Sequence, residues 1–165
     1  FNRTLAMQLL LLRHGIAEDH GPDGMDDSRR LTDKGVTKTT AVAAGLARIA
    51  DCPDIIFTSP KVRARQTAAI VARAFDMQPQ VAAVIGDNDA DAMCGWLKRI
   101  DHDTVMLVGH EPSFSGIVEK LCTGSPGNFI EMKKAGCACL DVSSNATAAI
   151  LQWLTPAKLL IAMGA

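Results

Sequence analysis

The chain has 165 residues, of which 48% are hydrophobic, and its 17 basic and 18 acidic side chains give a formal net charge of −1. Since domains usually span about 100–200 residues, this length allows one compact domain and excludes a large multidomain enzyme. The balanced charge excludes a broad basic surface for nucleic acid or an anionic membrane. We expect a single domain over residues 7–165 with a small or locally recognised partner.

The N-terminal segment is hydrophobic but lacks the pattern of a signal peptide. Gln8 interrupts the apolar run, and Arg13 and His14 stand where a cleavage site of small residues would be needed. No stretch of the sequence reaches the roughly 20 apolar residues of a membrane helix. We therefore interpret Met7 as the natural start and residues 1–6 as a remnant that precedes it.

The five cysteines do not form a disulfide framework. Their number is odd and no C-x-x-C pair occurs, which favours reduced thiols and a cytoplasmic protein. Cys137 and Cys139 alternate within one predicted strand, so both should face the same side of it. We interpret them as small core residues, because zinc would need further ligands nearby.

Short hydrophobic runs alternate with helical patterns in the first 121 residues. The runs are continuous or rich in branched residues, as is typical of strands buried on both faces. The segments between them repeat apolar residues at helical spacing. Thr32 is the predicted N-cap of the first helix, and the second begins just after Pro60. The predicted strands are 8–12, 55–57, 81–85 and 105–108, and the apolar residues that mark the four helices span 36–49, 68–75, 93–100 and 114–121.

This alternation predicts a parallel sheet covered by helices on both faces, with right-handed crossovers. The end of the chain differs, because a loop at 124–127 precedes two predicted strands, 135–142 and 148–154, joined by a turn at 143–145. We expect an α/β fold: a three-layer α/β/α sandwich with a mostly parallel central sheet and a C-terminal antiparallel hairpin.

Cationic and imidazole side chains follow three of the predicted strands. Arg13 and His14 come after the first strand, Arg63 shortly after the second, and His110 after the fourth. In open α/β sheets, ligands bind at the carboxyl ends of the parallel strands, so these side chains should meet at one edge. Guanidinium forks beside helix N-termini suit a tetrahedral phosphoryl group, and a carboxylate less well.

A zinc site at His14 and His110 is the main alternative to an anion site. The neighbouring arginines would repel a cation, and the only further candidate ligands at the strand ends are Glu111 and Asp87. The chain also lacks the G-x-x-x-x-G-K-[ST] phosphate loop of nucleotide hydrolases. We therefore expect no metal and no cofactor.

Four motifs in this order resemble those of the histidine phosphatase superfamily. They are R-H-G at 13–15, R-R-L-T-D-K-G at 29–35, S-P-K-V-R-A-R-Q-T-A at 59–68 and V-G-H-E-P at 108–112. The resemblance runs from about residue 8 to residue 121, and the terminal hairpin is compatible with it. The short connections look similar to those of the bacterial SixA-type phosphohistidine phosphatases, which lack lid insertions.

The resemblance implies a role for each matching residue. His14 matches the nucleophile that becomes phosphorylated, through one ring nitrogen, while a hydrogen bond at the other nitrogen, expected to a backbone carbonyl, fixes the tautomer. The pocket that holds the phosphoryl oxygens would contain Arg13, Arg63 and a protonated His110, with Arg29 at its edge and Gly15 and Ser59 as further substrate-binding residues.

The position of a proton donor is open. Relatives acting on phosphate esters place a carboxylic acid after the third strand, where this chain has Asp87 and Asp89. Either aspartate would serve as the acid, or both would only cap or precede the next helix. A missing acid favours a substrate with a nitrogen–phosphorus bond, because phosphoimidazole leaves as a readily protonated nitrogen.

The function expected from these features is that of a metal-independent phosphohistidine phosphatase in signal transduction. Its partner would be a phosphohistidine-bearing phosphotransfer or phosphocarrier protein, its product inorganic phosphate, and its state a monomer. A phosphatase for small phosphate esters and a non-catalytic phosphate-binding module are the two alternatives.

Overall fold

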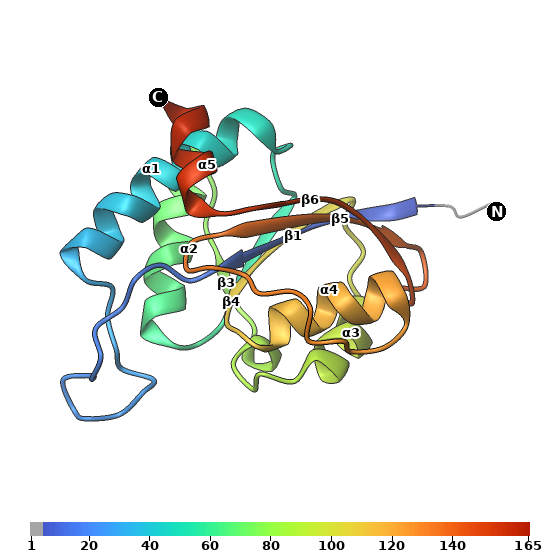
Figure 1. Cartoon of the computed structure of the whole chain (residues 1–165), viewed down its shortest axis with the longest axis horizontal. Coiled ribbons are helices and arrows are strands. Elements are labelled where there is room, and N and C mark those ends of the chain that lie inside the picture. The colour runs from blue at the N-terminus through green and yellow to red at the C-terminus, as the bar shows by residue number, and fades with distance from the viewer. Residues whose placement is uncertain (1–4) are drawn as a thin grey trace.

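A computed structural model describes residues 5–165 and contains one six-stranded sheet with helices on both faces (Figure 1). The strands are β1 (Leu5–Arg13), β2 (Ile55–Thr58), β3 (Gln80–Val81), β4 (Thr104–Gly109), β5 (Cys137–Ser143) and β6 (Ala149–Thr155). The helices are α1 (Asp33–Ile49), α2 (Val62–Ala74), α3 (Ala90–Leu97), α4 (Ser113–Thr123) and α5 (Ala157–Gly164), with a short 3₁₀ helix η1 (Ala83–Ile85) before α3.

The sheet has the order β3-β2-β4-β1-β5-β6, with β1 near its centre. β1 pairs in parallel with β4 and antiparallel with β5, and β5 pairs antiparallel with β6. The predicted hairpin therefore extends the parallel part of the sheet, as expected. Burial also follows the prediction, since the side chains of Leu9, Leu10, Leu11 and Leu12 in β1 are fully buried.

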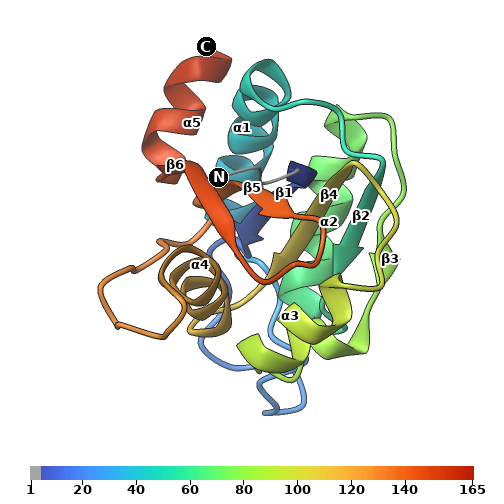
Figure 2. The ribbon, with the colours of Figure 1, turned by 90° about the vertical axis from the view of Figure 1, so that its right-hand side faces the viewer.

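Successive leucines of β1 enter opposite layers of the core. Leu10 and Leu12 belong to the cluster beneath α1, α2 and α5, whereas Leu9 and Leu11 pack with residues of α3 and α4. This alternation is the period of two that a strand imposes on its side chains. Figure 2 shows the sheet between the two helical layers, which confirms the predicted three-layer α/β/α sandwich.

Two predictions of secondary structure need correction. The predicted strand 81–85 is wrong beyond Val81, because β3 is a two-residue edge strand and the chain then turns into η1. Ile85 is still buried, as its apolar character indicates, but from a 3₁₀ turn rather than a strand. Helix α5 was not predicted, since its eight residues form a short, nearly continuous apolar run that periodicity does not distinguish from a strand.

The close packing of α5 on α1 depends on a glycine. A Cβ atom at Gly45 would collide with the backbone carbonyl of Leu160, so the two helices approach there only because the side chain is a hydrogen. The N-terminus of α1 follows the prediction, because the Thr32 side chain accepts a hydrogen bond from the Gly35 amide.

The cysteines of the described chain are all free thiols, and Cys137 and Cys139 are buried in the same core cluster. Burial raises the pKa of Cys139 to about 11 and that of Cys137 well above its usual value, so both act as core residues, as expected. No helix within residues 5–165 combines the length and hydropathy needed to cross a membrane. Of the predicted remnant 1–6, residues 1–4 lie outside the described residues.

Candidate active site

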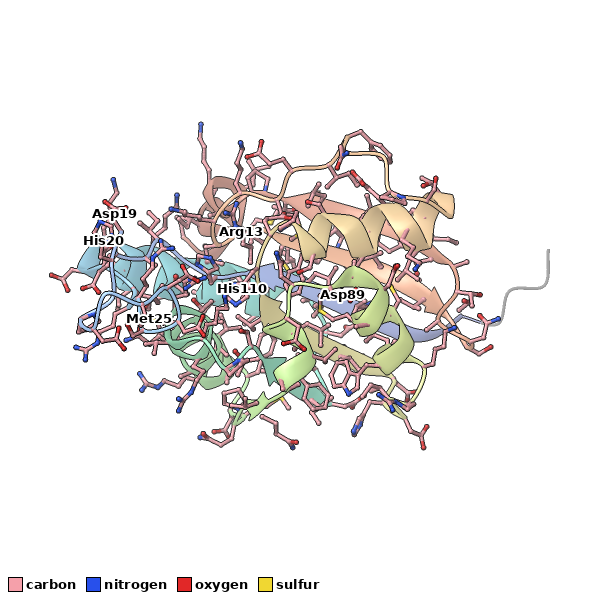
Figure 3. The ribbon with its side chains drawn as sticks, turned by 90° about the horizontal axis from the view of Figure 1, so that it is seen from below. Arg13, Asp19, His20, Met25, Asp89 and His110 are labelled. Carbon is pink, nitrogen blue, oxygen red and sulfur yellow. The ribbon has the colours of Figure 1, made fainter. Side chains whose placement is uncertain are left out.

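The carboxyl ends of the parallel strands bring the predicted residues together. Arg13 ends β1 and pairs in register with Gly109, which places His14 beside His110. Figure 3 shows Arg13 and His110 next to each other at one end of the sheet. The ring centroids of His14 and His110 are 5.1 Å apart and the rings are tilted by 53°. The predicted convergence at one sheet edge is therefore what the fold produces.

The ring of His14 is oriented by the backbone that follows it. Its Nδ1 lies 2.7 Å from the carbonyl oxygen of Gly15, and since a carbonyl only accepts, Nδ1 donates and Nε2 keeps its lone pair. This is the backbone contact expected at the second ring nitrogen. Gly15 is required there, because a Cβ would collide with the buried hydroxyl of Thr39. The Gly15 amide donates to Thr67 Oγ1 at 3.0 Å, which joins this turn to α2.

His110 is held by Ser59, the first residue after β2. His110 Nε2 and Ser59 Oγ are 2.7 Å apart. Ser59 Oγ also accepts a hydrogen bond from the Lys61 amide at 3.3 Å, which fixes the hydroxyl group beside the imidazole. Ser59 was predicted to bind substrate. The contact that the structure shows is with His110, whose ring Ser59 helps to orient.

Three buried nitrogen atoms at this edge lack a hydrogen-bond partner within the described chain. They are Arg13 Nε, Arg63 Nε and His110 Nδ1. Nearly all buried polar groups in folded proteins are paired, and each exception calls for an explanation. Two of these nitrogens belong to permanently charged guanidinium groups. An anion with several oxygens is a suitable partner for the two guanidinium nitrogens, and for His110 Nδ1 when that nitrogen carries a proton; a phosphoryl group has the required charge.

Both histidines are neutral near pH 7 in this environment. Burial lowers the pKa of His14 to about 4, and the charges of Arg63 and Arg13 act in the same direction. Burial, then the neighbouring His14 and Arg63, lower the pKa of His110 to about 3. In the protein by itself, burial and then the neighbouring charges disfavour the protonated His110 expected from the sequence. A bound phosphoryl dianion would raise this pKa again.

Stability should fall as the pH drops from about 6.5 toward 4. Because the folded-state pKa values of both histidines lie below the unfolded value of 6.5, the unfolded chain binds more protons in this window. By pH 5 each histidine removes on the order of 2 kcal/mol. Thermal unfolding at pH 7 and pH 5 should show a smaller loss for a His14→Asn/His110→Asn double variant than for the wild type. An equal loss in both proteins would contradict this assignment.

Arg63 and Arg29 are joined by an acidic residue that sequence reasoning missed. Arg63 donates from Nη1 to the backbone oxygen of Asp26 at 2.7 Å and from Nη2 to its Oδ2 at 2.9 Å. Arg29 Nη1 donates to Asp26 Oδ1 at 2.8 Å, and Lys61 pairs with the same carboxylate. Hydrogen bonds from Arg29 and then Arg63 hold the pKa of Asp26 well below its usual range. Arg29 is thus connected to Arg63 through the carboxylate of Asp26, next to the site where it was predicted to lie.

The two candidate proton donors lie at the surface, unlike the buried side chains described above. Asp87 and Asp89 are both exposed, and Asp89 caps α3 by accepting from the Asp91 and Ala92 amides at 2.9 and 3.0 Å. The helix-cap alternative therefore accounts for Asp89. Glu111, the other acid weighed at a strand end, accepts hydrogen bonds from Ser115 and from the Met132 amide.

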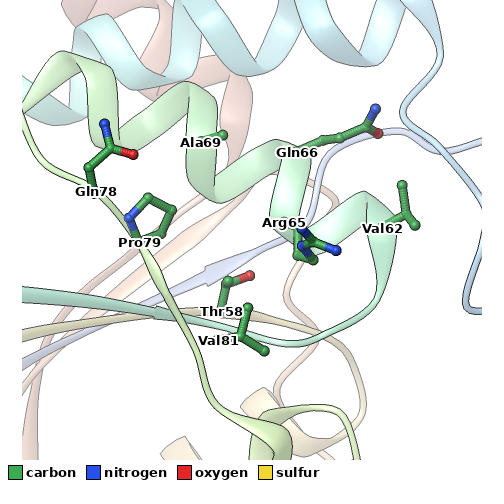
Figure 4. A pocket seen from close by; sticks show the side chains of 8 residues that line it. All are labelled: Thr58, Val62, Arg65, Gln66, Ala69, Gln78, Pro79 and Val81. Atoms are coloured by element: carbon green, nitrogen blue, oxygen red, sulfur yellow. The ribbon is translucent and has the colours of Figure 1, made fainter.

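Two surface pockets lie close to the site, and neither is lined by His14, Arg63 or His110. A pocket of about 450 Å³ lies between α2 and the β3 edge (Figure 4). Its lining includes Arg65, Gln66 and Val81, but none of the residues predicted to hold phosphate. A second pocket, of about 310 Å³, is lined by Arg13 and Glu111 together with residues of α4 and the segment that follows it. Of these two pockets, the second contains a residue predicted to hold phosphate, Arg13, although three glutamates share its lining.

Comparison with known proteins agrees with these features. The model of the histidine phosphatase superfamily (branch 1) matches residues 9–95. An uncharacterized protein of Picosynechococcus sp. is 38% identical over 135 residues, which cover 79% of this chain and 82% of that protein.

Several solved structures share the fold. The protein histidine phosphatase SixA, solved as a complex with tungstate, has a TM-score of 0.81 at 22% identity, over 93% of this chain and 99% of that one. A phosphoserine phosphatase from Entamoeba histolytica, in complex with 3-phosphoglyceric acid, has a TM-score of 0.67 at 15% identity, over 90% and 96% of the two chains. At such identities, these likenesses establish the architecture and no particular substrate.

Proposed function

Because the chain belongs to the histidine phosphatase superfamily, we propose that it is a metal-independent phosphatase that removes phosphate from phosphohistidine on proteins. The observation that carries the proposal is the state of His14. Its ring is neutral, its Nδ1 is tied to the Gly15 carbonyl, and its Nε2 lone pair is left beside cationic and unpaired donors. A nucleophilic nitrogen among anion-binding groups is what phosphoryl transfer requires.

The proposed reaction proceeds in two displacements. His14 Nε2 attacks phosphorus in line, a new N–P bond forms, and the substrate N–P bond breaks as its imidazole nitrogen takes up a proton. Water then attacks the phosphohistidine on His14, releases inorganic phosphate and restores the lone pair of Nε2. In both steps Arg13, Arg63 and His110 would hold the other phosphoryl oxygens, where preorganised donors typically contribute several kcal/mol.

The substrate class follows from the leaving group. An alkoxide needs a proton from a placed acid, whereas a phosphoimidazole nitrogen protonates readily. Asp89 is engaged as a helix cap and Asp87 is exposed, which supports a substrate with an N–P bond. The expected partner is a phosphotransfer or phosphocarrier protein of a cytoplasmic signalling system, and the protein would act on it as a monomer.

Replacing both Asp87 and Asp89 by asparagine should leave the cleavage of phosphohistidine nearly unchanged. Asparagine still caps a helix, so α3 should persist, and the reaction as proposed uses neither carboxyl group. Single-turnover rates of the double variant and the wild type on a histidine-phosphorylated carrier protein measure this. A loss of about 10²-fold or more, the scale of general acid catalysis, would assign the acid role to one of them.

The proposed function is tested by comparing two substrates with a chelator present throughout. A histidine-phosphorylated carrier protein tests the N–P linkage, and an aryl phosphate, which has a good leaving group, tests the nucleophile alone. We expect much faster release of phosphate from the carrier. Turnover of small esters only would favour the small-molecule phosphatase, and phosphate binding without any turnover would favour the non-catalytic module.

A further inference from the structure

The orientation of Arg13 depends on a segment far along the chain. Arg13 Nη1 donates to the backbone oxygen of Met132 at 2.6 Å, and Met132 is 1% exposed. This contact fixes one corner of the guanidinium and leaves Nε, which is buried and has no partner within residues 5–165. The position of the Met132 carbonyl therefore sets the direction in which Arg13 presents its remaining donors.

Met132 lies in the connection between α4 and β5, which has neither helical nor sheet hydrogen bonding at this residue. Two carboxylates of the α4 region replace that bonding. Glu119, within α4, accepts from the amides of residues 127–130 at 2.8–2.9 Å. Glu111, one residue before Pro112, accepts from the Met132 amide at 2.9 Å through Oε1. The segment 127–132 is thus tied to α4 by two acidic side chains.

The carboxylate of Glu111 is itself fixed. Its Oε1 accepts from Ser115 Oγ at 2.7 Å and its Oε2 from the Ser115 amide at 3.2 Å, in the first turn of α4. The Met132 backbone therefore links the two side chains. Its amide donates to the fixed carboxylate of Glu111, and its carbonyl oxygen accepts from Arg13. Without Glu111, the amide of a buried residue would lose its acceptor, and the backbone would have to move to find another.

We propose that Glu111 is a positioning residue for Arg13, acting through the backbone of Met132. The inference rests on the proposed function only in taking Arg13 as a ligand of the phosphoryl group. Arg13 and Glu111 also line the same pocket of about 310 Å³, so the two side chains are neighbours in the fold. A small displacement of such a group commonly costs 10-fold to about 10²-fold in rate.

The test uses variants at Glu111, alone and combined with a change at Arg13. For each variant, calorimetry measures the affinity for inorganic phosphate, and kinetics measure kcat/KM on an aryl phosphate. Glu111→Ala should weaken both about tenfold or more. Glu111→Gln keeps a side-chain oxygen for the Met132 amide and should recover most of the loss. Asp101→Ala is the control, because this exposed acid precedes β4 and lies at the opposite end of the parallel strands from Arg13. It should leave both quantities unchanged.

The decisive comparison is made in an Arg13→Lys background, where no guanidinium fork remains to be oriented. There, Glu111→Ala should change the phosphate affinity less than about twofold. An equal loss in both backgrounds, or no loss in either, would overturn the inference. If Glu111→Ala does not fold, Glu111→Asp, one methylene shorter, takes its place among these variants. Phosphate affinity is measured without turnover, so failure of the proposed phosphatase activity would be seen separately.

Discussion

His14→Ala should lower turnover of phosphohistidine by about 10⁴-fold or more while the protein stays folded. In the proposed reaction His14 Nε2 makes the bond to phosphorus, and the other donors of the site have no nucleophilic role. The fold should tolerate the change, because the ring makes one backbone hydrogen bond within the described chain, to the carbonyl of Gly15, and packs on His110. Initial rates together with a melting curve measure both parts of this expectation.

The control for this experiment is His102→Ala, which removes an exposed imidazole just before β4, at the opposite end of that strand from His110, and should leave the rate unchanged. Rapid quenching of the wild type should also trap phosphate on His14, and the variant should trap none. Appreciable turnover by a folded His14→Ala protein would remove His14 from the role of nucleophile.

Arg63→Lys should lower kcat/KM by about 10²-fold to 10³-fold, although the charge is retained. The guanidinium of Arg63 is almost completely buried, and both Nη atoms are fixed by Asp26 while Nε stays unpaired. A lysine ammonium is a single point charge and cannot hold Asp26 and a phosphoryl oxygen in the same planar geometry. The loss should appear with phosphohistidine and with an aryl phosphate alike, because both share the phosphoryl group.

The matched control for Arg63→Lys is Arg65→Lys, two residues along the same helix, where the side chain is exposed and faces the pocket beside β3. Kinetics of the control should equal those of the wild type. If the two substitutions reduced kcat/KM equally, the loss would belong to α2 as a whole and not to the buried fork of Arg63.

The elements that local sequence patterns specify were predictable. Strand β1 is buried on both faces and reads as a continuous apolar run, and the placement of His14 and His110 followed from where the strands end. The parallel pairing of β1 and β2 with β4 then brings these residues together, since parallel strands end at the same edge of the sheet. The contact of His14 with a backbone carbonyl was also foreseen, because a nucleophilic imidazole needs its second nitrogen fixed.

The contacts that orient the arginines were not predictable. Asp26 meets Arg63 across 37 positions of sequence and Met132 meets Arg13 across 119, and both partners lie in irregular segments without periodicity. The pKa of His110 was not predictable for a related reason, since it depends on burial and on charges that the fold brings together. A local sequence pattern thus predicts which residues lie at the edge of the sheet, but it does not predict the distant residues whose hydrogen bonds orient them.

The central place of β1 also determines when the molecule can be completed. Leu10 pairs with Met106 on one side and with Cys139 on the other. Strand β1 can therefore pair only with strands that follow about 100 and 130 residues later in the described chain. During synthesis, its apolar side chains remain without a sheet until β4 and β5 have emerged. We therefore expect slow, all-or-none folding governed by these distant pairings, and little stable structure in fragments that stop before β4.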